Sequence, residues 1–145
     1  MNKLEEIIES INLKNLDKAL NQCNDCEKDS NNNSHLISNF RGVIYFLKKD
    51  LNLAEINFLK SHKLNNKFED PIKNLFLIYL NKKSLNKALE FSKKLYAINN
   101  KNDLYIYQLA YINELIGDNI SALNFYKKCI ELDGENKLKA LNNIG

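Results

Sequence analysis

The sequence has little of what interrupts helices. Its 145 residues include one proline, four glycines, three cysteines and no tryptophan. Runs of β-branched residues, which would mark strands, are missing, whereas Leu, Lys, Glu, Ala and Ile are frequent and are mostly good helix formers. Because the number of cysteines is odd, a fully paired disulfide framework is excluded. These absences predict an all-α chain.

Long apolar runs and concentrated charge are also missing. The longest apolar run, residues 75–80, is too short to span a bilayer, and the first residues, MNKLEEIIES, lack the basic start and apolar stretch of a signal peptide. The net charge of +3 is spread over lysines that cluster only in pairs, so no basic stripe for phosphate binding is present. We expect a cytoplasmic protein without membrane insertion or a nucleic-acid partner.

Catalytic and metal-binding side chains are scarce. His35 and His62 have no cysteine or acidic residue at the spacing of a nucleophile pair or a metal site, and both are predicted to be polar surface residues. A glycine-rich phosphate loop is absent. We therefore expect no enzyme activity, no cofactor and no metal.

What the sequence does contain is an internal repeat. Four stretches align: NLDKALNQC (15–23), NLAEINFLK (52–60), SLNKALEFS (84–92) and NISALNFYK (119–127). Their alanines follow one another at 35, 34 and 34 residues, and they are Ala19, Ala54, Ala88 and Ala122. A period of 34 residues in a helical chain indicates helix–turn–helix units.

Polar residues mark the helix starts that this period predicts. Asp50, Ser84 and Asp118 are good N-cap residues for the second helix of each pair. Asp70 is expected to cap another helix, with Pro71 in its first turn. The run 31–34 is predicted to be a loop that takes up the extra residue of the first spacing.

The pattern resembles tandem tetratricopeptide repeats (TPR). In the best unit, 103–136, the family positions are filled by Leu109, Ala110, Gly117, Asp118, Ala122, Tyr126 and Cys129. The other units, roughly 1–33, 35–68 and 69–102, depart further; for example, Arg41 replaces a large apolar residue. The resemblance implies a single all-α domain over 1–145, a right-handed superhelical solenoid of antiparallel helix pairs, with a partial or capping helix at 137–145.

Two kinds of side chain are expected to pack between the helices. Small residues would allow close approach, and aromatic residues would fill the remaining space; the small ones are Gly42, Ala54, Ala88, Ala110 and Ala122, and the aromatic ones are Tyr45, Phe58, Tyr79 and Tyr126. In the last segment, Leu141, Ile144 and Gly145 are assigned to the large, large and small places.

The pair Cys23-Asn24-Asp25-Cys26 has three interpretations: a redox pair, half of a zinc site, or two packed residues. Cys23 and Cys26 follow Ala19 at the same intervals at which Tyr126 and Cys129 follow Ala122. This register favours two small apolar residues on the buried side of a second helix. A redox role stays open.

The resemblance also implies a binding groove, because the first helices of such repeats line a concave face. Projection of the helical period predicts that this face carries Leu36, Asn39, Val43, Phe46, Lys73, Leu77, Leu80, Leu104, Tyr107, Tyr111 and Glu114. So apolar an exposed surface usually marks an interaction site. The carboxylate clamp of one family subtype is not expected, since Asn74 matches it but Val43 and Leu104 do not.

The expected partner is therefore a protein or peptide with apolar anchors, such as an amphipathic helix. Three alternatives remain open. A neighbouring helix may cover the groove; the chain may be the regulatory or substrate-presenting N-terminal part of a larger bacterial enzyme such as a transferase; or copies may self-associate as homo-oligomers through the edge Ala140–Gly145.

Overall fold

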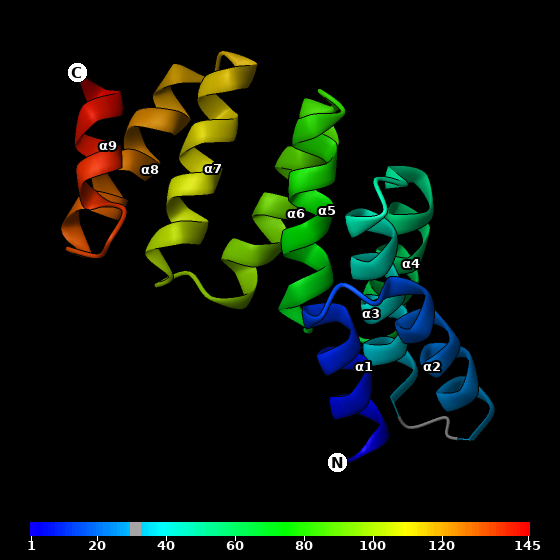
Figure 1. The fold of residues 1–145 in the computed structure, drawn as a ribbon. Helices are drawn as coiled ribbons and strands as arrows, with labels where there is room; N and C mark the ends of the chain where they lie inside the picture. The colour runs from blue at the N-terminus through cyan, green and yellow to red at the C-terminus, as the bar shows by residue number, and fades with distance from the viewer. Residues whose placement is uncertain (30–32) are drawn as a thin grey trace. The chain divides into compact units, whose positions relative to one another are not determined.

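The computed structural model describes residues 1–29 and 33–145, which form nine α-helices and no strand (Figure 1). The helices are α1 (Lys3–Asn12), α2 (Leu16–Asp29), α3 (Ser34–Leu47), α4 (Leu51–Leu64), α5 (Glu69–Asn81), α6 (Leu85–Ile98), α7 (Asp103–Ile116), α8 (Asn119–Glu131) and α9 (Lys137–Ile144). The predicted all-α helical-repeat class is confirmed. Within the described ranges, none of the helices has both the length and the apolar character needed to cross a membrane.

The helices form two compact units, Met1–Pro71 and Ile72–Gly145. In the first unit, α1 packs on α2, α2 on α3 and α3 on α4. In the second, α6 packs on α7, α7 on α8 and α8 on α9, while Tyr79 of α5 lies against Phe91 of α6 with ring centroids 5.4 Å apart. The single domain, its repeat boundaries and the handedness of the superhelix stay predictions.

The predicted starts of the second helices are confirmed. The carboxylate of Asp50 accepts the N–H of Leu53 at 3.0 Å, and that of Asp118 accepts the N–H of Ser121 at 3.1 Å. Ser84 stands at the N-cap of α6, but its side chain makes no capping hydrogen bond. These caps satisfy N–H groups that the first turn of a helix leaves without partners.

Two local predictions need correction. Helix α5 begins at Glu69, so Asp70 lies inside its first turn and does not cap it, because the helix extends one residue further back than expected. Pro71 does lie in that first turn, where its missing N–H leaves no acceptor unpaired. Of the predicted loop 31–34, residues 31–32 lie outside the described residues and Ser34 already belongs to α3.

The turn inside each helix pair has one repeated geometry. A residue with positive φ occurs at Lys14 (58°), Lys49 (67°), Lys83 (56°) and Gly117 (94°). In each turn the next residue donates its N–H to the carbonyl five positions earlier, as from Asp50 to Tyr45 at 2.9 Å and from Asp118 to Asn113 at 2.9 Å. This is the hydrogen-bond pattern of a Schellman C-cap. One residue therefore ends the first helix and the next begins the second.

The predicted small positions are buried. The four repeat alanines have exposures between 0% and 4%. At Gly42, an added Cβ would lie 2.5 Å from the ring of Phe58, so only glycine allows α3 and α4 to approach as they do. Of the predicted aromatic residues, Phe58, Tyr79 and Tyr126 are buried, whereas Tyr45 is half-buried.

The same contact position contains one large and one small residue in every repeat. Counting by the repeat period, Gly42 corresponds to Ile7, Phe76 and Ala110, while Phe58 corresponds to Cys23, Ser92 and Tyr126. The four pairs are therefore Ile7 with Cys23, Gly42 with Phe58, Phe76 with Ser92, and Ala110 with Tyr126. All eight residues are buried. Since interiors are close-packed, the large residue can lie on either helix provided that its counterpart is small.

The cysteines take part in this packing. Cys23 and Cys26 lie in one core cluster with Ile7, Ile37 and Ile44, and both thiols are free. Burial raises the pKa of the Cys23 thiol to about 11, which disfavours the reactive thiolate. The described residues contain no group of three metal-ligating side chains. The prediction that both cysteines lie on the buried side of α2 is confirmed.

A charge network that the sequence did not predict joins α2, α3 and α4. The guanidinium of Arg41 donates to Glu27 at 2.7 Å and to Asn24 at 2.7 Å, and the ammonium of Lys60 lies 3.1 Å from the other oxygen of Glu27. These hydrogen bonds lower the pKa of Glu27 to about 2. Arg41, which departs from the family pattern, therefore connects neighbouring repeats.

Helix α9 follows a register different from the predicted one. Ala140 is fully buried, whereas Leu141 and Ile144 are 43% and 41% exposed, so the assignment of Leu141, Ile144 and Gly145 to packing places is wrong by one residue. The cause is an anchor at the start of α9. The carboxylate of Asp103 accepts the backbone N–H of Asn136 at 2.9 Å and its side-chain N–H at 3.0 Å.

The histidines are less exposed than predicted. His35 and His62 are both half-buried, and the ring of His35 packs edge-on against Phe68 with centroids 5.3 Å apart. The carbonyl of His35 also accepts the hydroxyl of Ser61 at 2.7 Å. Contacts across the turn between α4 and α5 therefore cover His35.

Replacing Gly42 with Ala is expected to lower the free energy of unfolding by about 1–3 kcal/mol, because the added methyl group overlaps the Phe58 ring. Urea titration of the wild type, Gly42→Ala, Phe58→Leu and the double variant measures this. The double variant should lose less stability than the sum of the two single changes. Simple additivity would contradict a direct contact.

Replacing Glu27 with Gln is expected to lower the free energy of unfolding at pH 7 by about 1 kcal/mol, the upper range for exposed ion pairs. A lowered folded-state pKa stabilises the protein above about pH 4.5 and stops doing so as the pH falls towards 2. Urea titrations at pH 7 and pH 3 should therefore give a larger pH effect for the wild type than for Glu27→Gln. Glu90→Gln, which removes a single exposed pair with Lys94, is the control and should behave like the wild type.

Candidate functional site

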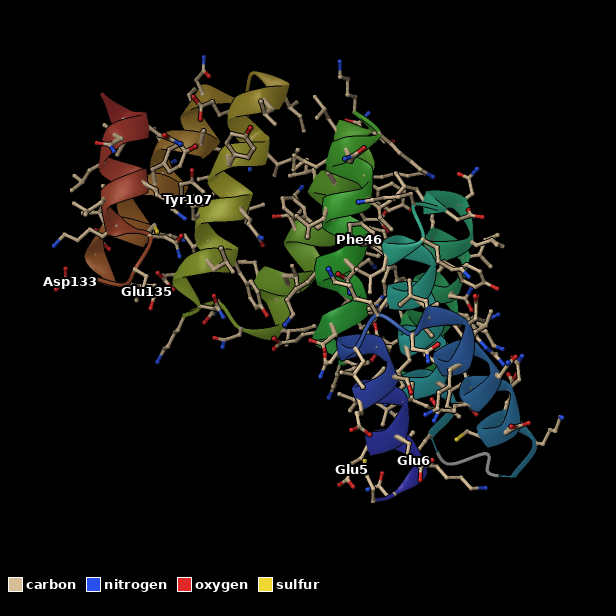
Figure 2. All side chains as sticks on the ribbon, in the orientation of Figure 1. Glu5, Glu6, Phe46, Tyr107, Asp133 and Glu135 are labelled. Atoms are coloured by element: carbon tan, nitrogen blue, oxygen red, sulfur yellow. The ribbon has the colours of Figure 1, made fainter. Side chains whose placement is uncertain are left out.

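The predicted groove residues of the first unit lie on α3. Leu36, Val43 and Phe46 are half-buried, and Phe46 is labelled in Figure 2. Asn39 is only 5% exposed, so a partner cannot reach it in this conformation. Because α3 packs against both α2 and α4, more of its surface is covered than the projection implied.

In the second unit, the predicted residues of α5 differ in exposure. Leu77 is 49% exposed, whereas Lys73 and Leu80 are half-buried. Leu77 is therefore the accessible apolar anchor on this helix.

The predicted residues of α7 form the most complete surface. Leu104 and Tyr111 are 39% and 36% exposed, Glu114 is exposed, and Tyr107 is half-buried. Spacings of three, four and three residues place all four on one side of the helix. We call these four residues the tyrosine face; Figure 2 labels Tyr107 near the side of α7 that borders α9.

The rings of the tyrosine face are ordered by stacking. Tyr107 and Tyr111 lie nearly parallel, with ring centroids 6.4 Å apart and an angle of 6° between their planes. Beneath them, the buried Tyr126 of α8 packs against Tyr107 at 5.8 Å. Aromatic side chains in such contacts keep a flat apolar surface towards solvent at low entropic cost on binding.

A hydrogen-bond network fixes the polar groups of this face. The hydroxyl of Tyr126 donates to Oε2 of Glu114 at 2.6 Å. The amide of Asn143 on α9 donates to the hydroxyl of Tyr126 at 2.7 Å and to that of Tyr107 at 3.3 Å. Helices α7, α8 and α9 therefore all contribute to the position of Glu114.

Burial and the neighbouring Glu114 carboxylate raise the pKa of Tyr126 far above its usual range. The phenol therefore remains protonated and continues to donate to Glu114 near neutral pH. Within the described ranges, no lysine, arginine or histidine lies within ion-pair distance of Glu114. The carboxylate is thus oriented by the protein but has no counter-ion from it.

Two contributors were not predicted from the sequence. Tyr126 was assigned only to packing, yet its hydroxyl reaches the surface carboxylate. Asn143 lies 34 residues after the buried Leu109, so the repeat pattern assigns it to the core and gives no signal of a polar role. The acidic and basic groups of α2 and α3, by contrast, are already paired with each other and offer no comparable free charge.

Comparison with known proteins identifies the repeat. The family model described as a tetratricopeptide repeat matches residues 105–136, the segment that contains most of the tyrosine face. No curated protein sequence matches the chain.

Solved structures share the fold at low sequence identity. MamA from Desulfovibrio magneticus RS-1 has a TM-score of 0.74 at 20% identity, over 90% of this chain and 73% of that one. YrrB, a TPR protein with an unusual peptide-binding site, has a TM-score of 0.72 at 14% identity, over 92% and 68%. A TPR protein from Parabacteroides merdae ATCC 43184 has a TM-score of 0.81 at 18% identity, over 92% of this chain and 54% of that one. At these identities the likeness concerns the fold alone.

Replacing Tyr126 with Phe is expected to lower the free energy of unfolding by about 1–2 kcal/mol, because it removes a hydrogen bond to a charged group. A raised folded-state pKa means that this stabilisation is fully present below about pH 10 and declines only above it. Thermal or urea unfolding at pH 7 measures the effect. Tyr96→Phe, which loses only a 3.4 Å contact from Lys128, is the control, and an equal loss in both variants would contradict the assignment.

Proposed function

Since the chain is a tetratricopeptide-repeat protein, we propose that it is a protein-interaction scaffold whose first helices bind a peptide, a helix or a partner domain. The binding surface is the tyrosine face on α7, together with the exposed Leu77 on α5. The observation that carries the proposal is the set of large apolar side chains exposed on these helices, namely Leu77, Leu104 and Tyr111. YrrB, which has this fold and a peptide-binding site, adds support.

Two features make the tyrosine face suitable for recognition. Its rings are rigid, because stacking and the contact with Tyr126 hold Tyr107 in place, so little side-chain entropy is lost on binding. Its mixture of apolar, hydroxyl and carboxylate groups resembles the composition of protein interfaces, where tyrosine is enriched. The half-buried residues Leu36, Val43 and Phe46 of α3 are a lesser surface of the same kind in the first unit.

A second candidate function is suggested by α9. Leu138, Leu141 and Ile144 are 72%, 43% and 41% exposed, which leaves one side of this helix apolar and uncovered. A following domain of a larger enzyme, or another copy of the chain, would bury that side. The encoded reading frame tests the first option, and sedimentation velocity at several protein concentrations tests the second.

Replacing Tyr111 or Leu77 with Asp is expected to weaken peptide binding at least about tenfold, because a buried charge replaces an apolar anchor. Peptides selected from a random-sequence display library provide the ligands, and fluorescence anisotropy gives their Kd. Ile120→Asp on α8, where the wild-type side chain is 79% exposed, is the matched control and should bind like the wild type. Selected peptides whose Kd ignores both Leu77→Asp and Tyr111→Asp would rule out this surface.

A further inference from the structure

We propose that the tyrosine face recognises a basic side chain, lysine or arginine, in the partner segment. Glu114 would be its counter-ion, and the rings of Tyr107 and Tyr111 would lie along its stem. This inference rests on the function proposed above and specifies the chemistry of the partner.

The first argument is the state of Glu114. One of its oxygens accepts the Tyr126 hydroxyl at 2.6 Å, whereas an ionised carboxylate can accept about four hydrogen bonds. The side chain is exposed, and in the part of the chain that the structure describes no cation pairs with it. A carboxylate that is already oriented and still lacks a counter-ion favours a cationic ligand.

The second argument comes from how this protein uses its other aromatic rings. The ammonium of Lys128 lies 5.9 Å from the ring centre of Tyr96 and 5.4 Å from that of Phe125, and that of Lys94 lies 5.7 Å from the ring centre of Phe91. Among the described residues, the rings of Tyr107 and Tyr111 have no such cation. They are parallel and stand one helical turn from Glu114, so a basic side chain that contacts Tyr111 can reach the carboxylate.

The third argument concerns the opposite end of the face. The Tyr107 hydroxyl accepts from Asn143, and its own proton has no acceptor among the described residues, so it can donate to a backbone carbonyl of the partner. Leu104 offers an apolar contact at the far end. Ten residues of α-helix separate Leu104 from Glu114, a distance of about 15 Å. An extended partner covers that distance in about five residues.

The partner segment is therefore expected to carry an apolar residue and a basic residue about five positions apart if it is extended. The order in which the two occur depends on the direction in which the segment binds. A helical partner would separate them by about ten positions.

The test is selection of a random-sequence display library on three forms of the full chain: the wild type, Glu114→Gln and Glu114→Lys. Glu114→Gln removes the charge and keeps an acceptor for Tyr126, and circular dichroism confirms that each form is folded. Wild-type peptides are expected to be enriched in lysine and arginine, and Glu114→Lys peptides in aspartate and glutamate. Replacing the basic residue of a wild-type peptide with norleucine or citrulline should weaken its binding about fivefold, and Glu114→Gln should have the same effect.

The remaining outcomes separate this inference from the proposed function. Peptides that bind the wild type, are lost with Tyr111→Asp, and show no basic enrichment would overturn the inference and leave the scaffold function standing. Selection of no peptide by any form would overturn both. A wild-type chain that sediments as a dimer and a Glu114→Lys chain that sediments as a monomer would show that a second copy occupies the face, which also overturns the inference.

Discussion

Close packing at a single pair of positions in each repeat is the constraint on which the rest of the structure depends. Where α3 meets α4, Gly42 lies directly against the Phe58 ring, and the other helix pairs have one large and one small buried residue at the equivalent places. A second large residue there would separate the helices, and a second small one would leave a cavity. The alanines of the repeat and the turns between helices act within the limits that this contact sets.

This constraint also supports the candidate site. In the last helix pair the small residue is Ala110 and the large one is Tyr126, whose ring packs in the core while its hydroxyl extends to Glu114. A phenylalanine at that position would fill the same space, but it would leave the surface carboxylate unsupported. The orientation of Glu114 is therefore a consequence of which large residue fills the core of this particular repeat.

The features that could be predicted from the sequence are those that recur with the period. The caps at Asp50 and Asp118 and the buried positions of Ala19 and Cys23 follow from local chemistry and register, and each is found where expected. The position of α9 was misjudged because its register is set by a bond between residues 33 positions apart, Asp103 and Asn136.

The parts of the candidate site that escaped prediction depend on single side chains and not on the period. The exposed residues of α7 follow from helical projection, since one side of that helix stays uncovered. The role of Asn143 does not, because a polar residue at a position that repeats as apolar can be placed only once the neighbouring helix is known. Asn39 shows the opposite error: projection alone cannot tell how much of α3 two neighbouring helices cover.

The left-handed residues of the turns make the repeats energetically unequal. All four turns use the same hydrogen bonds, but three contain a lysine in a conformation that disfavours any residue with a Cβ, at about 1–2 kcal/mol each, and only the turn at Gly117 avoids this strain. In a repeat chain, stability is a sum of local and nearest-neighbour contributions, so opening begins where the local contribution is weakest. As far as the turns decide it, the repeat that carries the tyrosine face keeps its amide protons protected from solvent exchange the longest.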